Sequence, residues 1–253
     1  MSGTNLITVC VAGKNQCAID ALNYLIKIKK NINIVSLVNK SDNGKDNWQK
    51  SFKKFSLKKK IKIMKLKELY NLKNLFLFSF EYENLLKVNL FKSKNLFNFH
   101  FSLLPKYRGC HTNFYQIFKG EKISGVTLHK IDKGIDTGGI IDSIKFKVDI
   151  NDTAYKNYLK LMKYSLVLFK QNFKNIIDKN YKIKKQNLKK GSYFSRESVK
   201  YKSLINIKKI DNKMSTHNLI RSLIFPPFQV PIYQGKKIKR SFYKKNKIQL
   251  LFL

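Results

Sequence analysis

The chain has 253 residues, 43% of them hydrophobic, and lysine and arginine outnumber aspartate and glutamate by 52 to 15. This length and apolar content are enough for one α/β domain with a small appendage, and they exclude an intrinsically disordered chain. No apolar run approaches the roughly 20 residues of a membrane-spanning helix, so a membrane protein is not expected.

The net charge of +37 raises the question of a nucleic-acid partner. Only four of the basic residues are arginine, the side chain whose planar guanidinium best recognises phosphates and bases. The lysines are spread along the whole chain, so we interpret the charge as a solvated lysine surface and expect no nucleic-acid partner. Three scattered cysteines without metal-ligand spacing, and an N-terminus unlike a signal peptide, predict a cytoplasmic protein with reduced thiols.

Short apolar runs alternate with stretches of helical periodicity through the first 180 residues. Helical spacing recurs in residues 18–26 and 48–55, and a capping residue among 151–153 is expected to begin a long helix that ends near Asn180. The alternation predicts an α/β fold, with a Rossmann-like, mostly parallel sheet covered by helices on both faces. The expected strands occupy residues 7–12, 34–38, 61–64, 75–78, 96–101, 125–128 and 140–148.

The last third of the chain differs in composition, being basic and rich in short strand and loop patterns. Within it, Ser215 or Thr216 is expected to cap a short helix that runs to Leu223 and is stopped by the two prolines that follow Phe225. The change in composition predicts a catalytic domain over residues 1–181. It also predicts a small C-terminal segment for substrate binding or dimerisation over residues 182–253.

Three polar residues stand out because of their positions. Asn98 and His100 are two residues apart in an apolar stretch, so on a strand their side chains point to the same face, at the strand's carboxyl end. Asp136 lies between Gly134 and Gly138, in a loop that can adopt unusual backbone conformations. Each of these features alone is more often structural than functional.

Together they resemble the signature of the 10-formyltetrahydrofolate-dependent formyltransferases. The family's Asn-x-His matches residues 98–100, its Ser-Leu-Leu-Pro-x-x-Arg-Gly matches residues 102–109, and its Gly-Val-Thr … Asp-x-Gly-x-Asp-Thr-Gly matches residues 125–138. One departure is Gly139, where many members carry aspartate. The resemblance implies a formyl donor, 10-formyltetrahydrofolate, and no metal, with Asn98, His100 and Asp136 as catalytic residues.

Formyl transfer is an acyl transfer in which an amine attacks the formyl carbon and negative charge develops on the formyl oxygen. Asn98 and His100 are candidate donors to that oxygen, and His100 and Asp136 are candidates for moving the proton of the amine. Which of these two is the formal base stays open at this point.

By the same resemblance, the folate site follows the strand expected at residues 75–78. Ser79 and Tyr82 are therefore candidate folate contacts, together with Asp132 and Gly134 of the third motif. The aromatic residues of this loop could equally belong to the core.

The acceptor amine is less well indicated. Methionyl-tRNA formyltransferases usually carry a further β-barrel domain of about a hundred residues, but only about 70 residues follow the expected long helix. The shorter nucleotide-sugar N-formyltransferases resemble the chain better, at residues 110–117 and 221–228. We therefore expect transfer to a sugar such as dTDP-4-amino-4,6-dideoxyglucose, for surface polysaccharide biosynthesis.

Candidate contacts to that sugar are aromatic planes for its base and polar groups for its diphosphate. Phe225 and Phe228 could instead pack the C-terminal segment onto the core. A methionyl-tRNA formyltransferase and a non-catalytic polyanion-binding protein are the alternatives, and a homodimer is expected from the resemblance alone. The candidate substrate-binding residues are Arg108, His111, Asn113, Arg221, Phe225 and Phe228.

Overall fold

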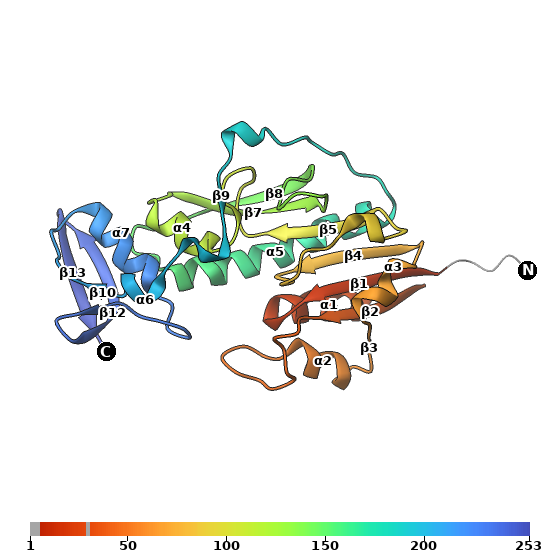
Figure 1. The fold of residues 1–253 in the computed structure, drawn as a ribbon, viewed down its shortest axis with the longest axis horizontal. Coiled ribbons are helices and arrows are strands. Elements are labelled where there is room, and N and C mark those ends of the chain that lie inside the picture. Colours follow the sequence, from red (N-terminus) through yellow and green to blue (C-terminus); the bar gives the residue numbers. More distant parts are fainter. Residues whose placement is uncertain (1–5, 29–30) are drawn as a thin grey trace, which may run out of the picture.

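The computed structural model describes residues 6–28 and 31–253, and a seven-stranded sheet lies at its centre (Figure 1). The strand order is β3-β2-β1-β4-β5-β7-β8. The first five strands in this order pair in parallel, whereas β7 and β8 are antiparallel and complete one side of the sheet. The strands are β1 (Ile7–Gly13), β2 (Ile32–Val38), β3 (Lys62–Ile63), β4 (Leu75–Phe80), β5 (Asn95–His100), β7 (Ile123–Lys130) and β8 (Ile140–Lys147).

Helices cover both faces of this sheet. On one face, α1 (Asn15–Ile28) and α5 (Ala154–Ile177) bury Val9 and Val11 of β1 in the largest hydrophobic cluster. On the other face, Cys10 and Ala12 pack with α3 (Leu66–Tyr70) in a second cluster. Because β1 is buried on both sides, its sequence is a continuous apolar run without alternation. The mostly parallel, Rossmann-like sheet predicted from the sequence is thus confirmed.

The long helix α5 begins as predicted. The hydroxyl of Thr153 accepts a hydrogen bond from the Lys156 backbone N–H, which satisfies one of the free donors of the first turn. The helix ends at Ile177, three residues before the predicted end. Among the residues that the structure describes, no helix combines the length and the apolar character needed to cross a membrane.

The C-terminal part forms its own small layer. A four-stranded sheet, in the order β10-β11-β12-β13, packs with α7 around a third hydrophobic cluster. A segment of residues 182–194, here called the return segment, links this part to the sheet by running back past β8, where Lys184 pairs with Ile140, and then along β6 (Figure 1). The remaining elements are α2 (Phe52–Lys58), η1 (Val88–Leu90), β6 (Arg108–Gly109), α4 (Thr112–Phe118), η2 (Leu188–Lys190), β9 (Tyr193–Phe194), η3 (Arg196–Ser198), α6 (Tyr201–Leu204), β10 (Asn206–Ile207), α7 (Met214–Leu223), β11 (Ile232–Tyr233), β12 (Lys236–Lys244) and β13 (Lys247–Phe252).

Some local predictions were wrong. Helix α7 begins at Met214, so Ser215 and Thr216 lie inside its first turn and neither caps it; the Thr216 hydroxyl instead donates to Asp211. Its end at Leu223 is confirmed. Trp48 lies outside α2, which begins only at Phe52, because Ser51 accepts the capping hydrogen bond. Helix α4 was not predicted.

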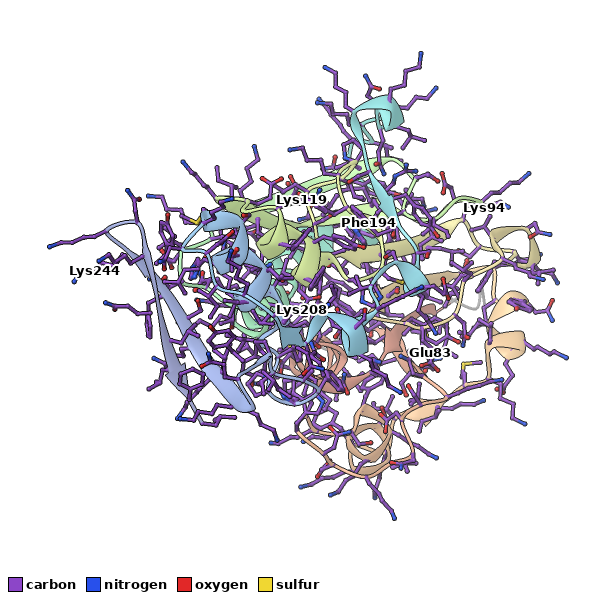
Figure 2. All side chains as sticks on the ribbon, turned by 60° about the vertical axis from the view of Figure 1, so that its left-hand side comes forward. Glu83, Lys94, Lys119, Phe194, Lys208 and Lys244 are labelled. Carbon is purple, nitrogen blue, oxygen red and sulfur yellow. The ribbon has the colours of Figure 1, made fainter. Side chains whose placement is uncertain are left out.

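The lysines lie on many parts of the surface. Figure 2 shows nitrogen-tipped side chains projecting around the whole outline, and it labels Lys94, Lys119, Lys208 and Lys244 on well-separated elements. This distribution agrees with the interpretation of the charge as a solvated lysine surface.

Candidate active site

A cleft of about 900 Å³ opens beyond the carboxyl ends of β1, β4 and β5. This edge of a parallel sheet is where open α/β proteins bind ligands, and the volume suits a substrate of nucleotide size. Lys14, Glu81 and His100 line the cleft from these three strand ends. Tyr201 and Phe225 line it from the C-terminal part, so both parts of the chain contribute to one cavity.

Asn98, His100 and Asp136 meet in this cleft, as their positions in the sequence predicted. The Asn98 side-chain amide donates to Asp136 Oδ1 at 3.2 Å. His100 Nδ1 lies 3.4 Å from Asp136 Oδ2, which also accepts the Gly109 backbone N–H at 2.9 Å. The carboxylate therefore joins the end of β5 to the loop that follows β7.

The loop that carries Asp136 is held by hydrogen bonds from the return segment. Asp136 has a left-handed backbone with φ of 53°, and its side chain would turn away if the loop relaxed. The buried side-chain amide of Gln186, in the return segment, donates to the Asp136 carbonyl at 2.9 Å and to the Gly138 carbonyl at 2.6 Å. Asp132 accepts from the Gly134 N–H and the Thr137 hydroxyl, and is not part of the cleft lining. These two hydrogen bonds shape the loop, and the folate contact of Asp132 stays a prediction.

His129 is a fourth member of the cluster, which sequence reasoning missed. It lies opposite Asn98 in the antiparallel pairing of β5 and β7. Its Nε2 is 3.2 Å from Asn98 Nδ2 and 3.5 Å from Asp136 Oδ1, while its Nδ1 contacts the Lys130 carbonyl at 2.7 Å. His129 falls within the third motif, so the sequence contained a signal for it. Its position opposite Asn98, however, depends on the register between β5 and β7.

Charge is stabilised strongly at Asp136. Burial alone would raise the pKa of this carboxyl, but attraction to a protonated His100, contact with His129 and the Gly109 N–H outweigh burial. The pKa of Asp136 consequently lies well below its ordinary value, and the group remains a carboxylate near neutral pH.

The proton of His100 can be assigned from its two contacts. Burial lowers the pKa of His100, against the opposing influence of Asp136 and of the Tyr107 carbonyl, so the ring is neutral near pH 7. A neutral imidazole donates from one nitrogen only, and the 2.7 Å contact between Nε2 and the Tyr107 carbonyl assigns the proton to Nε2. Nδ1 is then free to accept a proton beside the Asp136 carboxylate, which would stabilise the imidazolium that forms.

The cleft is lined by residues that pack with the two hydrophobic clusters on opposite faces of the sheet, and the part beside each cluster is here called a lobe. Tyr82, Leu86 and Ile131 line the first, here called the Tyr82 lobe, and pack with the second hydrophobic cluster. Trp48, Tyr158 and Phe225 line the second, the Trp48 lobe, and pack with the largest cluster. Of the predicted folate contacts, Ser79, Tyr82 and Gly134 line the cleft, as do the predicted substrate contacts His111, Asn113, Phe225 and Phe228.

The aromatic side chains of the Trp48 lobe differ in exposure. Phe225 is 6% exposed and packs edge-on against Tyr158 and Trp48, as the core interpretation predicted. Phe228 is 69% exposed, stacks on Phe225 with a centroid distance of 5.4 Å, and meets Trp48 edge-on at the same distance. Of these two phenylalanines, Phe228 thus presents the large free aromatic surface.

Comparison with known proteins assigns the family. Residues 6–166, more than half of the chain, match the family model described as formyl transferase. The chain belongs to the formyl transferase family. The fold, the family and the enzymatic nature of this formyltransferase are therefore as the sequence predicted.

Two solved structures resemble this formyltransferase over nearly its whole length. WlaRD, a sugar 3N-formyl transferase crystallised in the presence of dTDP and 5-N-formyl-THF, is 44% identical with a TM-score of 0.87, covering 94% of this chain and 86% of WlaRD. An N-formyltransferase from Helicobacter canadensis in complex with folinic acid and dTDP-3-aminofucose is 43% identical with a TM-score of 0.87, covering 93% and 87% of the two chains.

Curated relatives are longer. The bifunctional polymyxin resistance protein ArnA of Wigglesworthia glossinidia brevipalpis is 35% identical over 187 residues, which are 70% of this chain and 28% of ArnA. Methionyl-tRNA formyltransferase of Clostridium tetani is 33% identical over 143 residues, which are 56% of this chain and 45% of the relative. The chain thus spans less than half the length of these relatives.

Two arginines of the formyltransferase lie outside the cleft lining, contrary to prediction. Arg221 is 3% exposed and donates to Asn218 at 2.9 Å and to the Asp152 carbonyl at 2.8 Å, so it ties α7 to the start of α5. Burial lowers its pKa to about 10. Arg108 is also absent from the lining. Nε and Nη1 of Arg221 are engaged within the protein, and its contact with substrate stays a prediction.

Glu81 is a further polar residue of the cleft that sequence reasoning did not single out. It follows β4 with a left-handed backbone, φ 56°, and its Oε2 accepts the Tyr158 hydroxyl at 2.9 Å. Burial raises the pKa of Glu81 to about 6, since it outweighs the Tyr158 hydrogen bond and the attraction of Lys14. Near neutral pH the Glu81 side chain is thus a carboxylate whose negative charge is destabilised by burial.

This carboxylate should make the stability of the protein depend on pH. Because the folded-state pKa of about 6 exceeds the ordinary 4.5, stability is lost as the pH rises from 4.5 through 6. Glu81→Gln removes the buried charge that causes this loss of stability. We therefore expect the variant to be more stable than wild type by about 1–2 kcal/mol at about pH 8. The gap should shrink at pH 4.5, as measured by thermal unfolding at both values. A gap that is equal at the two values would contradict this expectation.

Proposed function

We propose that this formyltransferase transfers the formyl group of 10-formyltetrahydrofolate to the amine of a dTDP-linked 3-amino sugar. The observation that carries the proposal is the meeting of Asn98, His100 and Asp136 where the two lobes of one cleft join. Similarity to two enzymes whose structures hold a folate with dTDP or dTDP-3-aminofucose supports the choice of substrates. It favours an amine at position 3 over the 4-amino sugar that the sequence suggested.

The two lobes suit the two substrates. The Tyr82 lobe is apolar, with the buried Ser79 beside it, and would hold the flat ring system of the folate, which supplies an activated formyl carbon. The Trp48 lobe would hold the nucleotide-sugar, with the exposed ring of Phe228 against its base.

The diphosphate needs cations, and the adjoining surface supplies them. A hollow of about 190 Å³ shares Trp48 and Phe228 with the cleft and is lined by Lys14, Lys45 and Lys50. We assign the phosphate contacts to these lysines, because ammonium groups attract phosphate as point charges without a preferred plane.

His100 and Asp136 would carry the proton of the attacking amine. Nδ1 of the neutral His100 accepts that proton, while Nε2 keeps its own proton on the Tyr107 carbonyl. The resulting imidazolium lies 3.4 Å from the Asp136 carboxylate, which stabilises it. In this scheme His100 is the base, Asp136 orients and stabilises it, and the imidazolium gives the proton to the folate nitrogen as the bond between that nitrogen and the formyl carbon breaks.

Asn98 would stabilise the negative charge that develops on the formyl oxygen. Its side-chain amide has two N–H groups, which contact Asp136 and His129 at 3.2 Å each. A stronger acceptor, the developing oxyanion, would draw one of these N–H groups away from His129. The bond to Asp136 then keeps the amide oriented.

The two phenylalanines of the Trp48 lobe should behave differently when replaced. Phe228→Ala should raise KM for the nucleotide-sugar roughly tenfold with little loss of stability, because its ring is exposed and stacking on a base is worth about 1–3 kcal/mol. Phe225→Ala should instead lower the free energy of unfolding by about 3–5 kcal/mol, because that ring is buried. Steady-state kinetics and thermal unfolding of both variants test this, and an unchanged KM in Phe228→Ala would rule out the stacking role.

Mass spectrometry of the reaction tests the function directly. Purified protein is incubated with 10-formyltetrahydrofolate and either dTDP-3-amino-3,6-dideoxyhexose or dTDP-4-amino-4,6-dideoxyglucose. A gain of one formyl group, faster on the 3-amino sugar, is the expected result. No gain on either sugar, with the donor shown to be active by a control enzyme, would refute the sugar acceptor and make methionyl-tRNA the next acceptor to test. A place in surface polysaccharide biosynthesis, a cytoplasmic location and a homodimer remain predictions.

A further inference from the structure

Glu81 lines the same cleft as the reacting groups and takes no part in the proton transfers above. In the pairing of β4 with β5, Ser79 lies opposite Asn98, and the rings of Phe80 and Phe99 stack with centroids 4.5 Å apart. Glu81 follows directly after β4, His100 is the last residue of the neighbouring β5, and neighbouring strands are about 4.8 Å apart. Its side chain lines the same cleft.

The carboxylate has spare hydrogen-bonding capacity. Oε2 accepts one hydrogen bond, from the Tyr158 hydroxyl, which in turn accepts from the Gln49 amide at 3.0 Å. Within residues 6–28 and 31–253, the structure gives Oε1 no hydrogen-bond donor, although the side chain lines the cleft. Because a carboxylate can accept about four hydrogen bonds, Glu81 is short of donors that a ligand could supply.

The protein holds Glu81 in place at some cost. Its left-handed backbone is unfavourable for a residue with a side chain, and such strain is kept mainly at functional sites. The Asn39 side chain clamps the turn, donating to the Glu81 carbonyl at 3.0 Å and accepting from the Glu83 N–H at 3.3 Å. As a result Glu81 turns toward Tyr158 in the Trp48 lobe, whereas the next residue, Tyr82, packs in the other lobe.

We propose that Glu81 accepts a hydrogen bond from a hydroxyl group of the acceptor sugar next to the reacting amine, and so selects the position of that amine on the ring. The proposal rests on the function proposed above. Other parts of the substrates fit less well, because the diphosphate would be repelled by a carboxylate and the folate lies in the opposite lobe. The amine itself must be neutral to react and is served by His100, so the ring hydroxyls remain as donors.

Selectivity follows from this contact. A site built to hydrogen-bond a hydroxyl discriminates strongly against a substrate that lacks it, because a buried polar group is then left unpaired. In a sugar with its amine at another ring position, a different ring substituent would face Glu81 once the amine has reached His100. Glu81 is thus a binding residue that determines specificity, with Tyr158 as its positioning residue.

The test is a thermodynamic cycle that combines removal of the Glu81 carboxylate with removal of one substrate hydroxyl. The values of kcat/KM are measured for wild type and Glu81→Gln with dTDP-3-amino-3,6-dideoxyhexose and with its 2-deoxy and 4-deoxy analogues. We expect Glu81→Gln to lower kcat/KM about 10–100-fold on the parent sugar, but less than about threefold on the analogue that lacks the contacted hydroxyl. Glu68→Gln, the same change outside the cleft, should leave all values unchanged.

The outcomes separate the possible failures. An equal loss of kcat/KM on all three sugars would show a merely structural role and overturn the proposal, and so would no loss on any of them. Tyr158→Phe provides an independent check, because it should show the same dependence on one hydroxyl at a smaller size. If wild type formylates none of the sugars, the proposed function fails and this proposal fails with it.

Discussion

Replacing His100 with alanine should lower kcat by about 10³-fold while leaving the affinity for 10-formyltetrahydrofolate within about threefold of wild type. His100 is the side chain whose free nitrogen lies beside the Asp136 carboxylate, so its loss removes the route for the proton. The Tyr82 lobe, assigned to the folate, packs with the second hydrophobic cluster, of which His100 is not a member. The substitution should therefore leave the folate contacts unchanged. Single-turnover kinetics and a direct binding titration on the same sample measure the two quantities.

Asp136→Asn removes the negative charge of the side chain while keeping its shape, so it tests the role of that charge. It should lower kcat by a similar factor, about 10²–10³-fold, because the imidazolium would lose its partner. Asp178→Asn, the same change at the exposed end of α5, is the control and should be silent. Turnover close to wild type in either His100→Ala or Asp136→Asn would refute the catalytic assignment of that residue.

A second large effect is expected at Gln186, which never touches the reacting atoms in our scheme. Gln186→Leu removes both hydrogen bonds to the loop of Asp136, and a displacement of about 1 Å in a reacting group can lower the rate about 100-fold. We therefore expect kcat to fall about 10–100-fold, with KM for both substrates nearly unchanged. Stability should also fall, by about 1–3 kcal/mol, because two carbonyl groups lose their partner.

The pH profile separates positioning from simple destabilisation. If Gln186 positions Asp136, the variant should show a shifted acidic limb of kcat, because the contact between His100 and the carboxylate changes. Gln171→Leu, on the exposed face of α5, controls for the substitution itself. A variant that is less stable but has the wild-type kcat and pH profile would show that Gln186 contributes to the fold alone.

The main architecture was predictable because its signals are local and repeated. The apolar runs of β1 and β4 and the amphipathic stripe of α5 each show in a few consecutive residues, and the Thr153 cap follows from residue type. The convergence of Asn98 and His100 depends only on the two-residue period of a strand. Bringing Asp136 to them required the motif, since no local rule places a loop residue 36 positions away.

The missed residues share a physical cause. His129, Glu81 and Gln186 are single polar residues whose roles depend on contacts between distant segments: a strand register, a strained turn and the path of the return segment. Arg221 is a cation in a motif that predicts phosphate binding, but the structure buries its side chain. Its burial against backbone carbonyls depends on how α7 docks on α5, which composition does not reveal.

The return segment has a consequence for how such enzymes diversify. On its way to the C-terminal sheet it pairs with Ile140 and with β6, and it supplies Gln186 beneath the Asp136 loop. A recombination event that joined the first half of one relative to the second half of another at the end of α5 would exchange this support together with Phe225 and Phe228. The proposed base contact of Phe228 and the support of the Asp136 loop would thus be exchanged together, whereas Glu81, the proposed specificity residue, would stay with the first half.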